Sequence, residues 1–253
     1  MKELKARKVK LGPLTVSQVC FGTEHINQTI PEYGGDILVD AAMLHGVYFW
    51  DTDNAYGSQT QVAAALRKIE REEVVICSKT YGRTWEEAEF DLERTLTELD
   101  TSYLDIYLLH EVPAWTLGEK KNALNYLIKA KEEGKVRTIG LSTHSASIIS
   151  EAADIPEIEI VCAPFNREGS RIEEGGLDAM KTAMKKAHDN GKGVYGIKVL
   201  GKGELTYDII GALKWAMSHD FIDVYNLGVS NLSELRQNLS AVNMIAEGSD
   251  RSI

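Results

Sequence analysis

Four side chains that could move a proton follow three short apolar segments of the chain. Asp51 and Tyr56 come after the run Tyr-Phe-Trp, and Lys79 ends the run Val-Val-Ile-Cys-Ser. His110 follows the run Leu-Asp-Ile-Tyr-Leu-Leu. Short apolar runs are typical of buried parallel strands. Because α/β barrels carry their active sites at the carboxyl ends of the strands, we expect the four side chains to meet at one mouth.

Together these residue types could form a proton-donating site. An ordinary phenol has a pKa of about 10 and is a reluctant donor at neutral pH. Lys79 could lower the pKa of Tyr56 by stabilising the phenolate, and Asp51 could keep Lys79 charged. His110 could donate a hydrogen bond to a carbonyl oxygen. Such a site suits carbonyl reduction, in which a nicotinamide would supply the hydride.

Each residue also has an ordinary structural explanation. A lysine at a strand end is usually solvated or salt-bridged. A histidine after an apolar strand is more often a structural hydrogen-bonding residue, and Asp51 could cap a turn. The joint occurrence at matching ends of the second, third and fourth strands favours the catalytic interpretation.

Composition narrows the class of protein. The net charge of -10 over 253 residues argues against nucleic acid or an anionic membrane as a partner. No apolar run approaches the roughly 20 residues of a membrane helix, and no signal peptide is visible. Cys20, Cys77 and Cys162 are expected to be buried free thiols in a cytoplasmic protein. No metal is expected, because His, Cys and acidic residues lack ligand spacing.

Strand and helix patterns alternate along the chain. Residues 9–16 predict a hairpin that turns at Gly12-Pro13. Strands are expected at 17–22, 46–51, 73–78, 104–109, 137–142, 158–163, 193–198 and 223–228. Helices are expected at 35–45, 58–69, 85–99, 119–134, 145–153, 175–190, 206–218 and 231–246.

Eight such units predict an α/β fold, a single (β/α)₈ TIM barrel domain over 1–253 with a short N-terminal β-hairpin. The alternative is an open doubly wound sheet, but no Gly-x-Gly-x-x-Gly follows the first strand. Ser58, and Ser145 or Ser147, could cap helices, and Gly134 and Gly191 are expected to end them. The helix at 85–99 is expected to bury an apolar stripe of Phe90, Leu92, Leu96 and Leu99.

The chain resembles the aldo-keto reductases over nearly its whole length. The motifs that carry the resemblance are Gly22-Thr23, Trp50-Asp51-Thr52, Tyr56-Gly57, Ser78-Lys79-Thr80, 103–110, 134–137, 139–142 and 197–201. The resemblance implies an oxidoreductase barrel that reduces an aldehyde or ketone with NADPH or NADH. By position, the family's catalytic tetrad is matched by Asp51, Tyr56, Lys79 and His110, with Tyr56 as the acid.

The same resemblance implies a cofactor site with altered contacts. The nicotinamide amide would lie at Ser142, Thr143 and Cys162, where the family often has Asn and Gln at the last two. Ile197 replaces the usual stacking aromatic, and Cys162 could instead be a core thiol. The expected cofactor-binding residues are Gly22, Thr23, Ser142, Thr143, Cys162, Ile197, Lys198, Leu200, Gly228, Ser230, Glu234, Gln237 and Asn238.

The stretch 226–238 matches the segment that holds the cofactor's phosphate and adenine. NADPH users place Lys or Arg around the positions of Gly228, Ser230 and Glu234, and none is basic here. Glu234 would repel a 2′-phosphate and could accept from a ribose hydroxyl. We therefore expect NADH to serve at least as well as NADPH, unless the nearby cations Lys198, Lys202 and Arg236 bind the extra phosphate.

Two departures concern the walls of the site. The segment 201–205 is shorter than the belt that covers the cofactor in relatives, and the chain stops at Ile253 without a further wall for the pocket. We expect an open cleft and weak substrate discrimination. Glu111 could disfavour acidic substrates or be a solvated loop residue. Candidate walls are Phe21, His25, Trp50, Tyr81 and Trp115.

Two other functions remain open at this point. A nicotinamide-binding sensor or regulatory subunit would share the fold, although it would have no need of Tyr56. A lyase or isomerase could use Lys79 as a Schiff-base amine, which requires a neutral lysine. The expected partner is a small-molecule carbonyl substrate, and the chain is taken as a monomer by default.

Overall fold

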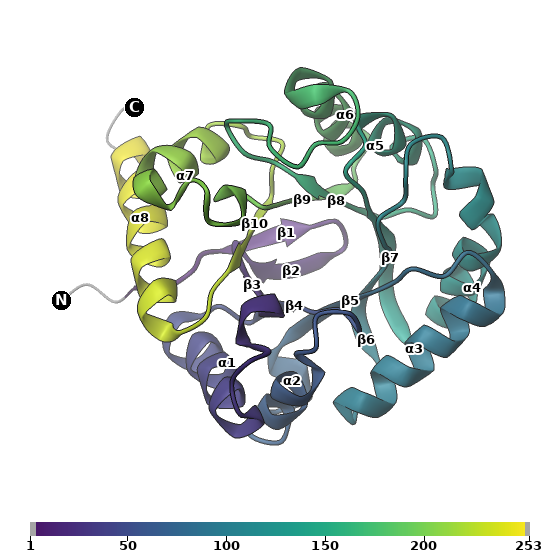
Figure 1. Cartoon of the computed structure of the whole chain (residues 1–253), viewed down its shortest axis with the longest axis horizontal. Helices are drawn as coiled ribbons and strands as arrows, with labels where there is room; N and C mark the ends of the chain where they lie inside the picture. The colour runs from purple at the N-terminus through teal and green to yellow at the C-terminus, as the bar shows by residue number, and fades with distance from the viewer. Residues whose placement is uncertain (1–3, 251–253) are drawn as a thin grey trace.

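The computed structural model describes residues 4–250, with side chains for residues 4–248. Eight parallel strands close into a barrel in the order β10-β3-β4-β5-β6-β7-β8-β9, and helices surround it (Figure 1). The barrel strands are β3 (Val19–Gly22), β4 (Phe49–Asp51), β5 (Val75–Thr80), β6 (Leu104–Leu109), β7 (Val136–Ser142), β8 (Ile160–Pro164), β9 (Gly193–Ile197) and β10 (Val224–Gly228). The closed barrel is confirmed, and the open sheet is excluded.

Each barrel strand is followed by a helix, as the alternating pattern predicts. The α-helices are α1 (Pro31–His45), α2 (Gln59–Leu66), α3 (Trp85–Leu99), α4 (Lys121–Glu132), α5 (Ala146–Ala152), α6 (Gly176–Asp189), α7 (Ile209–Met217) and α8 (Leu232–Asp250). Short 3₁₀ helices are η1 (Thr23–Ile26), η2 (Arg71–Glu73), η3 (Leu117–Lys120), η4 (Gly201–Gly203) and η5 (Thr206–Asp208). Among residues 4–250, no helix is long and apolar enough to cross a membrane.

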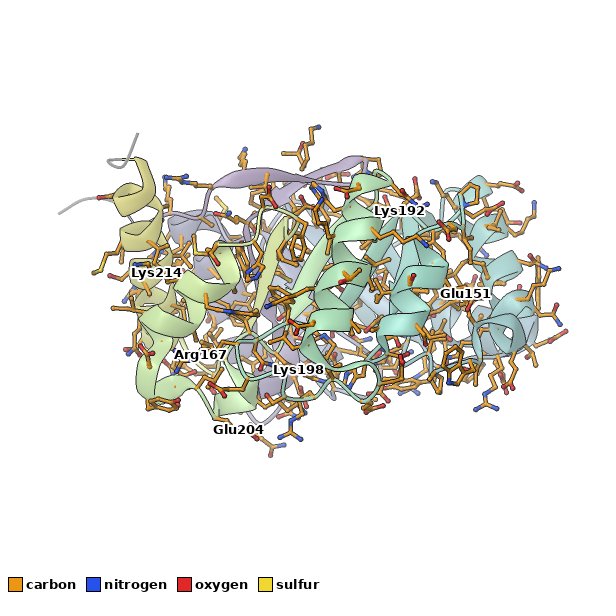
Figure 2. The ribbon with its side chains drawn as sticks, turned by 90° about the horizontal axis from the view of Figure 1, so that it is seen from above. Glu151, Arg167, Lys192, Lys198, Glu204 and Lys214 are labelled. Atoms are coloured by element: carbon orange, nitrogen blue, oxygen red, sulfur yellow. The ribbon has the colours of Figure 1, made fainter. Side chains whose placement is uncertain are left out.

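The predicted hairpin covers one end of the barrel. Strands β1 (Lys8–Leu11) and β2 (Leu14–Ser17) pair antiparallel, and Gly12 turns between them with φ 54°. Leu11 and Val16 are fully buried in the cluster that fills the barrel interior. Figure 2 shows the hairpin at one end of the barrel and Lys198 at the other. The carboxyl ends of the strands therefore form the open mouth.

All three cysteines are free and buried in the barrel interior, as expected. The apolar stripe of α3 is confirmed for Leu92, Leu96 and Leu99 but is wrong for Phe90, which is 67% exposed. Residue 90 lies two positions from Leu92, which is about 200° around a helix, so it faces solvent.

Helix α1 begins at Pro31, four residues before the predicted start. The glycine pair in its first turns does not break the helix but lets it approach α2. A Cβ on Gly35 would lie 2.9 Å from the Ala64 Cβ, and one on Gly34 would collide with Gln61. Glycine is required there by helix packing, which local propensity does not reveal.

Ser58 and Ser145 occupy the N-cap positions of α2 and α5, but neither side chain makes the expected capping hydrogen bond. Gly134 and Gly191 follow the ends of their helices with positive φ, as expected. The Ser58 hydroxyl instead lies 2.7 Å from the Thr23 hydroxyl. At α5, the Glu174 carboxylate accepts from the Ser147 N–H at 2.9 Å. A carboxylate from a distant loop therefore occupies the position expected for the serine oxygen.

Candidate active site

Three of the four expected residues form one contact cluster at the mouth. Asp51 ends β4, Lys79 lies in β5, and Tyr56 lies in the loop after β4. Lys79 Nζ donates to Asp51 Oδ1 at 2.7 Å, to the Thr52 carbonyl at 2.9 Å and to the Tyr56 hydroxyl at 3.2 Å. An ammonium has three N–H donors, so all of them are used.

Lys79 is held as a cation. Its side chain is 1% exposed, so burial alone would lower its pKa. Burial is the largest single effect, but Asp51 and, after it, Tyr56 and other neighbouring groups together outweigh it and raise the pKa of Lys79 well above its usual value. A Schiff-base mechanism needs a neutral amine, and this environment therefore argues against it.

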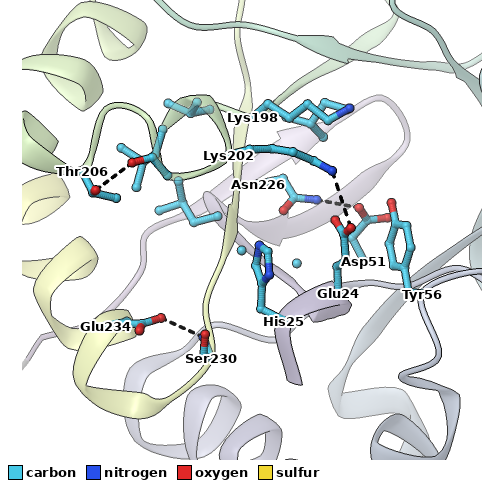
Figure 3. Close-up of a pocket in the computed structure, with 17 residues that line it drawn as sticks. Glu24, His25, Asp51, Tyr56, Lys198, Lys202, Thr206, Asn226, Ser230 and Glu234 are labelled. Atoms are coloured by element: carbon cyan, nitrogen blue, oxygen red, sulfur yellow. Dashed lines mark hydrogen bonds and ion pairs between the residues drawn. The ribbon is translucent and has the colours of Figure 1, made fainter. Parts of the chain in front are cut away.

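Asn226 completes the cluster, and sequence reasoning did not assign it a role. Its Nδ2 donates to Asp51 Oδ2 at 2.5 Å from β10 (Figure 3). The signal was present as a single amide inside the apolar strand Val-Tyr-Asn-Leu-Gly. Both oxygens of the Asp51 carboxylate thus have a partner, which fixes the direction of the ion pair with Lys79.

The expected lowering of the Tyr56 pKa is wrong for the protein alone. Burial raises the pKa of Tyr56 above its ordinary value and outweighs the lowering effect of Lys79. Tyr56 is therefore a protonated phenol at neutral pH. Its hydroxyl is nevertheless 3.2 Å from an ammonium that would stabilise the phenolate after the proton leaves.

His110 lies directly after β6 and is 4% exposed. Burial, followed by the charge of Lys79, lowers its pKa well below the ordinary value. The imidazole is therefore neutral and can offer one N–H. Its Nδ1 is buried without a hydrogen-bond partner. Lys120 Nζ donates to the His110 backbone carbonyl at 3.1 Å, which holds the backbone of His110. The Tyr81 ring packs edge-on against the imidazole, with the ring centres 4.7 Å apart, and so supports the position of the imidazole.

A cavity of about 310 Å³ runs from Asp51 and Tyr56 to the start of α8. Of the expected cofactor-binding residues, those that line it are Gly22, Ile197, Lys198, Leu200, Gly228, Ser230 and Glu234. Figure 3 shows Tyr56 and Glu234 at opposite sides of this space. A Cβ on Gly228 would lie 2.6 Å from the His25 ring, so the backbone here has no room for a side chain.

The other expected cofactor residues lie outside this cavity. Thr23 is fully buried, and its hydroxyl donates to the Asp51 carbonyl at 3.1 Å. The Thr143 hydroxyl donates to the Val112 carbonyl at 2.6 Å. Cys162 lies in the barrel core, which confirms the core-thiol alternative. Its neighbour across β7 and β8, Ser142, has a buried hydroxyl without a hydrogen-bond partner.

At the end of the cavity near α8, the Glu234 carboxylate accepts two hydrogen bonds from the preceding residues. Glu234 accepts from the Ser230 N–H at 2.8 Å and from Asn231 Nδ2 at 3.1 Å, while Asn231 caps the Glu234 N–H at 3.0 Å. The negative charge therefore lies at the helix N-terminus beside Ser230. Farther along the helix, Gln237 is exposed and Asn238 is buried.

The short loop after β9 crosses the cavity despite its length. Lys202 Nζ lies 3.6 Å from Glu24 Oε1, which joins this loop to η1 over the cavity (Figure 3). Arg171 Nη2 and Glu204 Oε1, 2.9 Å apart, tie the loop to the segment before α6. This contact bridges the loop and η1, and the expected open cleft stays a prediction.

Of the expected walls, His25 lines the cavity and Tyr81 packs on His110. Phe21 and Trp50 are wrong as walls, because both are fully buried in the core. Trp115 is 79% exposed in the loop after β6.

The fold and the contact cluster define a class of protein. It is an α/β barrel in which a tyrosine at the mouth is hydrogen-bonded to a lysine, with a cavity beside the pair. The family model described as aldo/keto reductase family matches residues 18–211. The chain belongs to the aldo/keto reductase family.

Individual relatives support the same family. The chain is 33% identical over 129 residues to an aldo-keto reductase of Mycolicibacterium paratuberculosis, covering 48% of this chain and 45% of that protein. It is 30% identical over 194 residues to probable aldo-keto reductase 1 of Glycine max, covering 69% and 56%. The matched part of the chain thus spans about half the length of these curated relatives.

Solved structures share the fold. A putative aldo-keto reductase from Pseudomonas aeruginosa superposes with a TM-score of 0.82 at 22% identity, covering 97% of this chain and 99% of the other. The holo form of an aldo-keto reductase from Bacillus halodurans gives a TM-score of 0.79 at 19% identity, covering 94% and 91%.

Proposed function

We propose that the protein reduces an aldehyde or ketone to an alcohol with NADH or NADPH. The observation that carries the proposal is the position of Lys79 Nζ, which lies 2.7 Å from Asp51 Oδ1 and 3.2 Å from the Tyr56 hydroxyl beside a long cavity. Membership in the aldo/keto reductase family supports the same chemistry.

The residues around the cavity fit a nicotinamide dinucleotide. Ile197 lines the cavity and can cover one apolar ring face. The Ser142 hydroxyl is buried outside the cavity lining and has no partner in the protein, so a carboxamide that reached it would supply one. Gly228 and Ser230 line the cavity just before α8, where the ribose and phosphates would lie, although the Ser230 N–H already donates to Glu234. When bound, the nicotinamide would supply a hydride to the carbonyl carbon.

Tyr56 would give the proton that completes the reduction. As negative charge develops on the carbonyl oxygen, the Tyr56 hydroxyl donates its proton to that oxygen. Lys79 then stabilises the phenolate, and Asp51 with Asn226 holds Lys79 in place. The neutral His110 imidazole can donate its N–H to the same oxygen. A positioned general acid of this kind typically contributes about 100- to 10,000-fold in rate.

The cofactor preference follows from the end of the cavity at α8. The Glu234 carboxylate lies beside the Ser230 N–H, where a 2′-phosphate would approach it. We propose that NADH serves at least as well as NADPH. One relative, an aldo-keto reductase of Schizosaccharomyces pombe at 28% identity over 78% of this chain and 62% of that protein, is named as NADP(+)-dependent. Binding titrations with both nucleotides test the point directly, and a kcat/KM that strongly favours NADPH would contradict it.

The test combines nucleotide binding with turnover. Nicotinamide fluorescence reports NADH and NADPH binding, and 4-nitrobenzaldehyde in the same cuvette reports oxidation of the nucleotide. Tyr56→Phe is expected to lower kcat by at least about 100-fold while nucleotide binding persists. The exposed Tyr33→Phe is the matched control and is expected to behave like the wild type. Binding without turnover on a broad carbonyl panel would favour the sensor instead.

A further inference from the structure

Lys198 is a cation at the mouth that the proposed reaction leaves unused. It lies directly after β9 and lines the same cavity as Tyr56 and Asp51. Figure 2 shows it at the end of the barrel opposite the hairpin. Figure 3 shows its side chain extending toward the side of the cavity that holds Tyr56 and away from Glu234.

The partner of Lys198 is a neutral ring. Lys198 Nζ lies 2.7 Å from His144 Nε2, and His144 Nδ1 lies 3.2 Å from Glu173 Oε1. An ammonium can only donate, so Nε2 accepts and Nδ1 carries the proton that points to Glu173. Burial, followed by the charge of Lys198, lowers the pKa of His144, which favours this neutral form.

This arrangement fixes the direction of the ammonium without cancelling its charge. Among the residues that the structure describes, no carboxylate lies within 4.0 Å of Lys198 Nζ. Burial, followed by the charge of Lys202, lowers the pKa of Lys198 from its ordinary value, and the charges of Glu111 and Glu24 oppose this shift. Two N–H donors of Lys198 therefore remain for a ligand.

The backbone also holds Lys198 in an uncommon conformation. Its φ is 56°, in the left-handed region that favours glycine. Asn166 Nδ2 and the Gly201 N–H both donate to the Lys198 carbonyl, at 3.2 Å and 2.8 Å. A lysine fixed in this conformation at the edge of a candidate active site is consistent with a binding role.

We propose that the Lys198 ammonium, held by His144, binds an acidic group of the substrate, so that the preferred substrates are aldehydes or ketones that carry a carboxylate or a phosphate. This inference rests on the proposed carbonyl reduction. It departs from the expectation that Glu111 disfavours acidic substrates, because Glu111 is exposed and forms no ion pair with Lys198. The same cation could otherwise serve the cofactor's pyrophosphate, and the experiment separates these two oxyanions.

The experiment compares 3- and 4-carboxybenzaldehyde with their methyl esters, in which a neutral and slightly larger ester group replaces the charged carboxylate. For at least one isomer, the wild type is expected to show a higher kcat/KM for the acid than for the ester. Lys198→Gln should lower this acid-to-ester ratio by about 10- to 100-fold, the span expected for losing a hydrogen bond to a charged group. Lys198→Arg should restore part of it.

Controls keep the outcomes distinct. Lys214→Gln removes the same charge from the exposed face of α7 and should leave the ratio unchanged (Figure 2). The Kd for NADH, measured by fluorescence without substrate, should be the same for wild type and Lys198→Gln. If Lys198→Gln lowered kcat/KM equally for acid and ester and also weakened NADH binding, Lys198 would be assigned to the cofactor. That result would overturn the inference.

The remaining outcomes also decide the matter. The acidic-substrate inference alone is overturned if the wild type prefers the ester for both isomers. It is also overturned if Lys198→Gln leaves the acid-to-ester ratio of kcat/KM unchanged. Turnover of 4-nitrobenzaldehyde that depends on Tyr56 would still stand in those cases and would keep the proposed function. Absence of any such turnover would remove the proposed function and this inference together.

Discussion

Asp53 is a buried carboxyl whose removal should make the protein more stable at neutral pH. It is fully buried in the loop between β4 and α2. Oδ1 accepts from the Ala55 N–H at 2.6 Å, whereas Oδ2 has no hydrogen-bond partner. Burial raises the pKa of Asp53 from 3.8 to about 6, against the lowering effect of Lys79. Asp53→Asn keeps an oxygen for Ala55 and removes the charge.

The magnitude follows from linkage between protonation and folding. A carboxyl whose pKa rises from 3.8 to about 6 on folding lowers the free energy of unfolding by about 3 kcal/mol once the pH exceeds both values. Below pH of about 4, the carboxyl is protonated in both states and costs nothing. Between pH of about 4 and 6, the carboxyl of the unfolded chain releases its proton while that of the folded protein keeps it. The free energy of unfolding therefore falls as the pH rises through this range.

The assay is urea unfolding of wild type and Asp53→Asn at pH 4 and pH 7. The variant should be more stable by about 3 kcal/mol at pH 7 and nearly equal at pH 4. Asp220→Asn, at an exposed position, is the control and should show little change at either pH. A gain of the same size at both pH values, or a loss at pH 7, would refute the reasoning.

Three further changes test other parts of the structure. Asn226→Ala leaves Asp51 Oδ2 buried without its partner and should cost about 1.5–3 kcal/mol in urea unfolding, with Asn226→Asp worse because it adds a second carboxylate. Glu234→Arg should raise the kcat/KM ratio of NADPH to NADH by roughly 10-fold, and an unchanged ratio would argue against Glu234 as the discriminating charge. Gly140→Ala would drive a Cβ into the Ile160 carbonyl between β7 and β8 and should lower Tm by roughly 6–12 °C, whereas an unchanged Tm would show that the strands can separate there.

The strand ends could be predicted because they depend on patterns that are local in the chain. Each of Asp51, Lys79 and His110 follows a short apolar run, and parallel strands deliver such residues to one end of a barrel. The contact between Asp51 and Lys79 then follows from the neighbouring positions of β4 and β5. The glycine ends of α4 and α6 were predictable for the same local reason.

What the sequence could not supply is the pairing between distant segments. Asn226 reaches Asp51 from β10, 175 positions along the chain, because barrel closure places β10 beside β3. Glu174 caps α5 from a loop, which displaced the expected serine caps. The pKa of Tyr56 depends on burial, and a motif alone shows only its lysine neighbour. The partner of Lys198, His144, likewise becomes visible only in three dimensions.

The opposing effects on Tyr56 suit a proton donor better than a lowered pKa would. A phenol that ionised readily would lose its proton before the substrate arrived, and burial prevents this. In the proposed reaction, the contact of 3.2 Å between Lys79 and Tyr56 would strengthen most when the phenolate forms, as the proton moves to the substrate. An interaction that strengthens along the reaction lowers the barrier, whereas one of constant strength would stabilise the resting state equally. The buried pair of Lys79 and Asp51 is expensive to desolvate, so its presence is better explained by this proposed role than by stability.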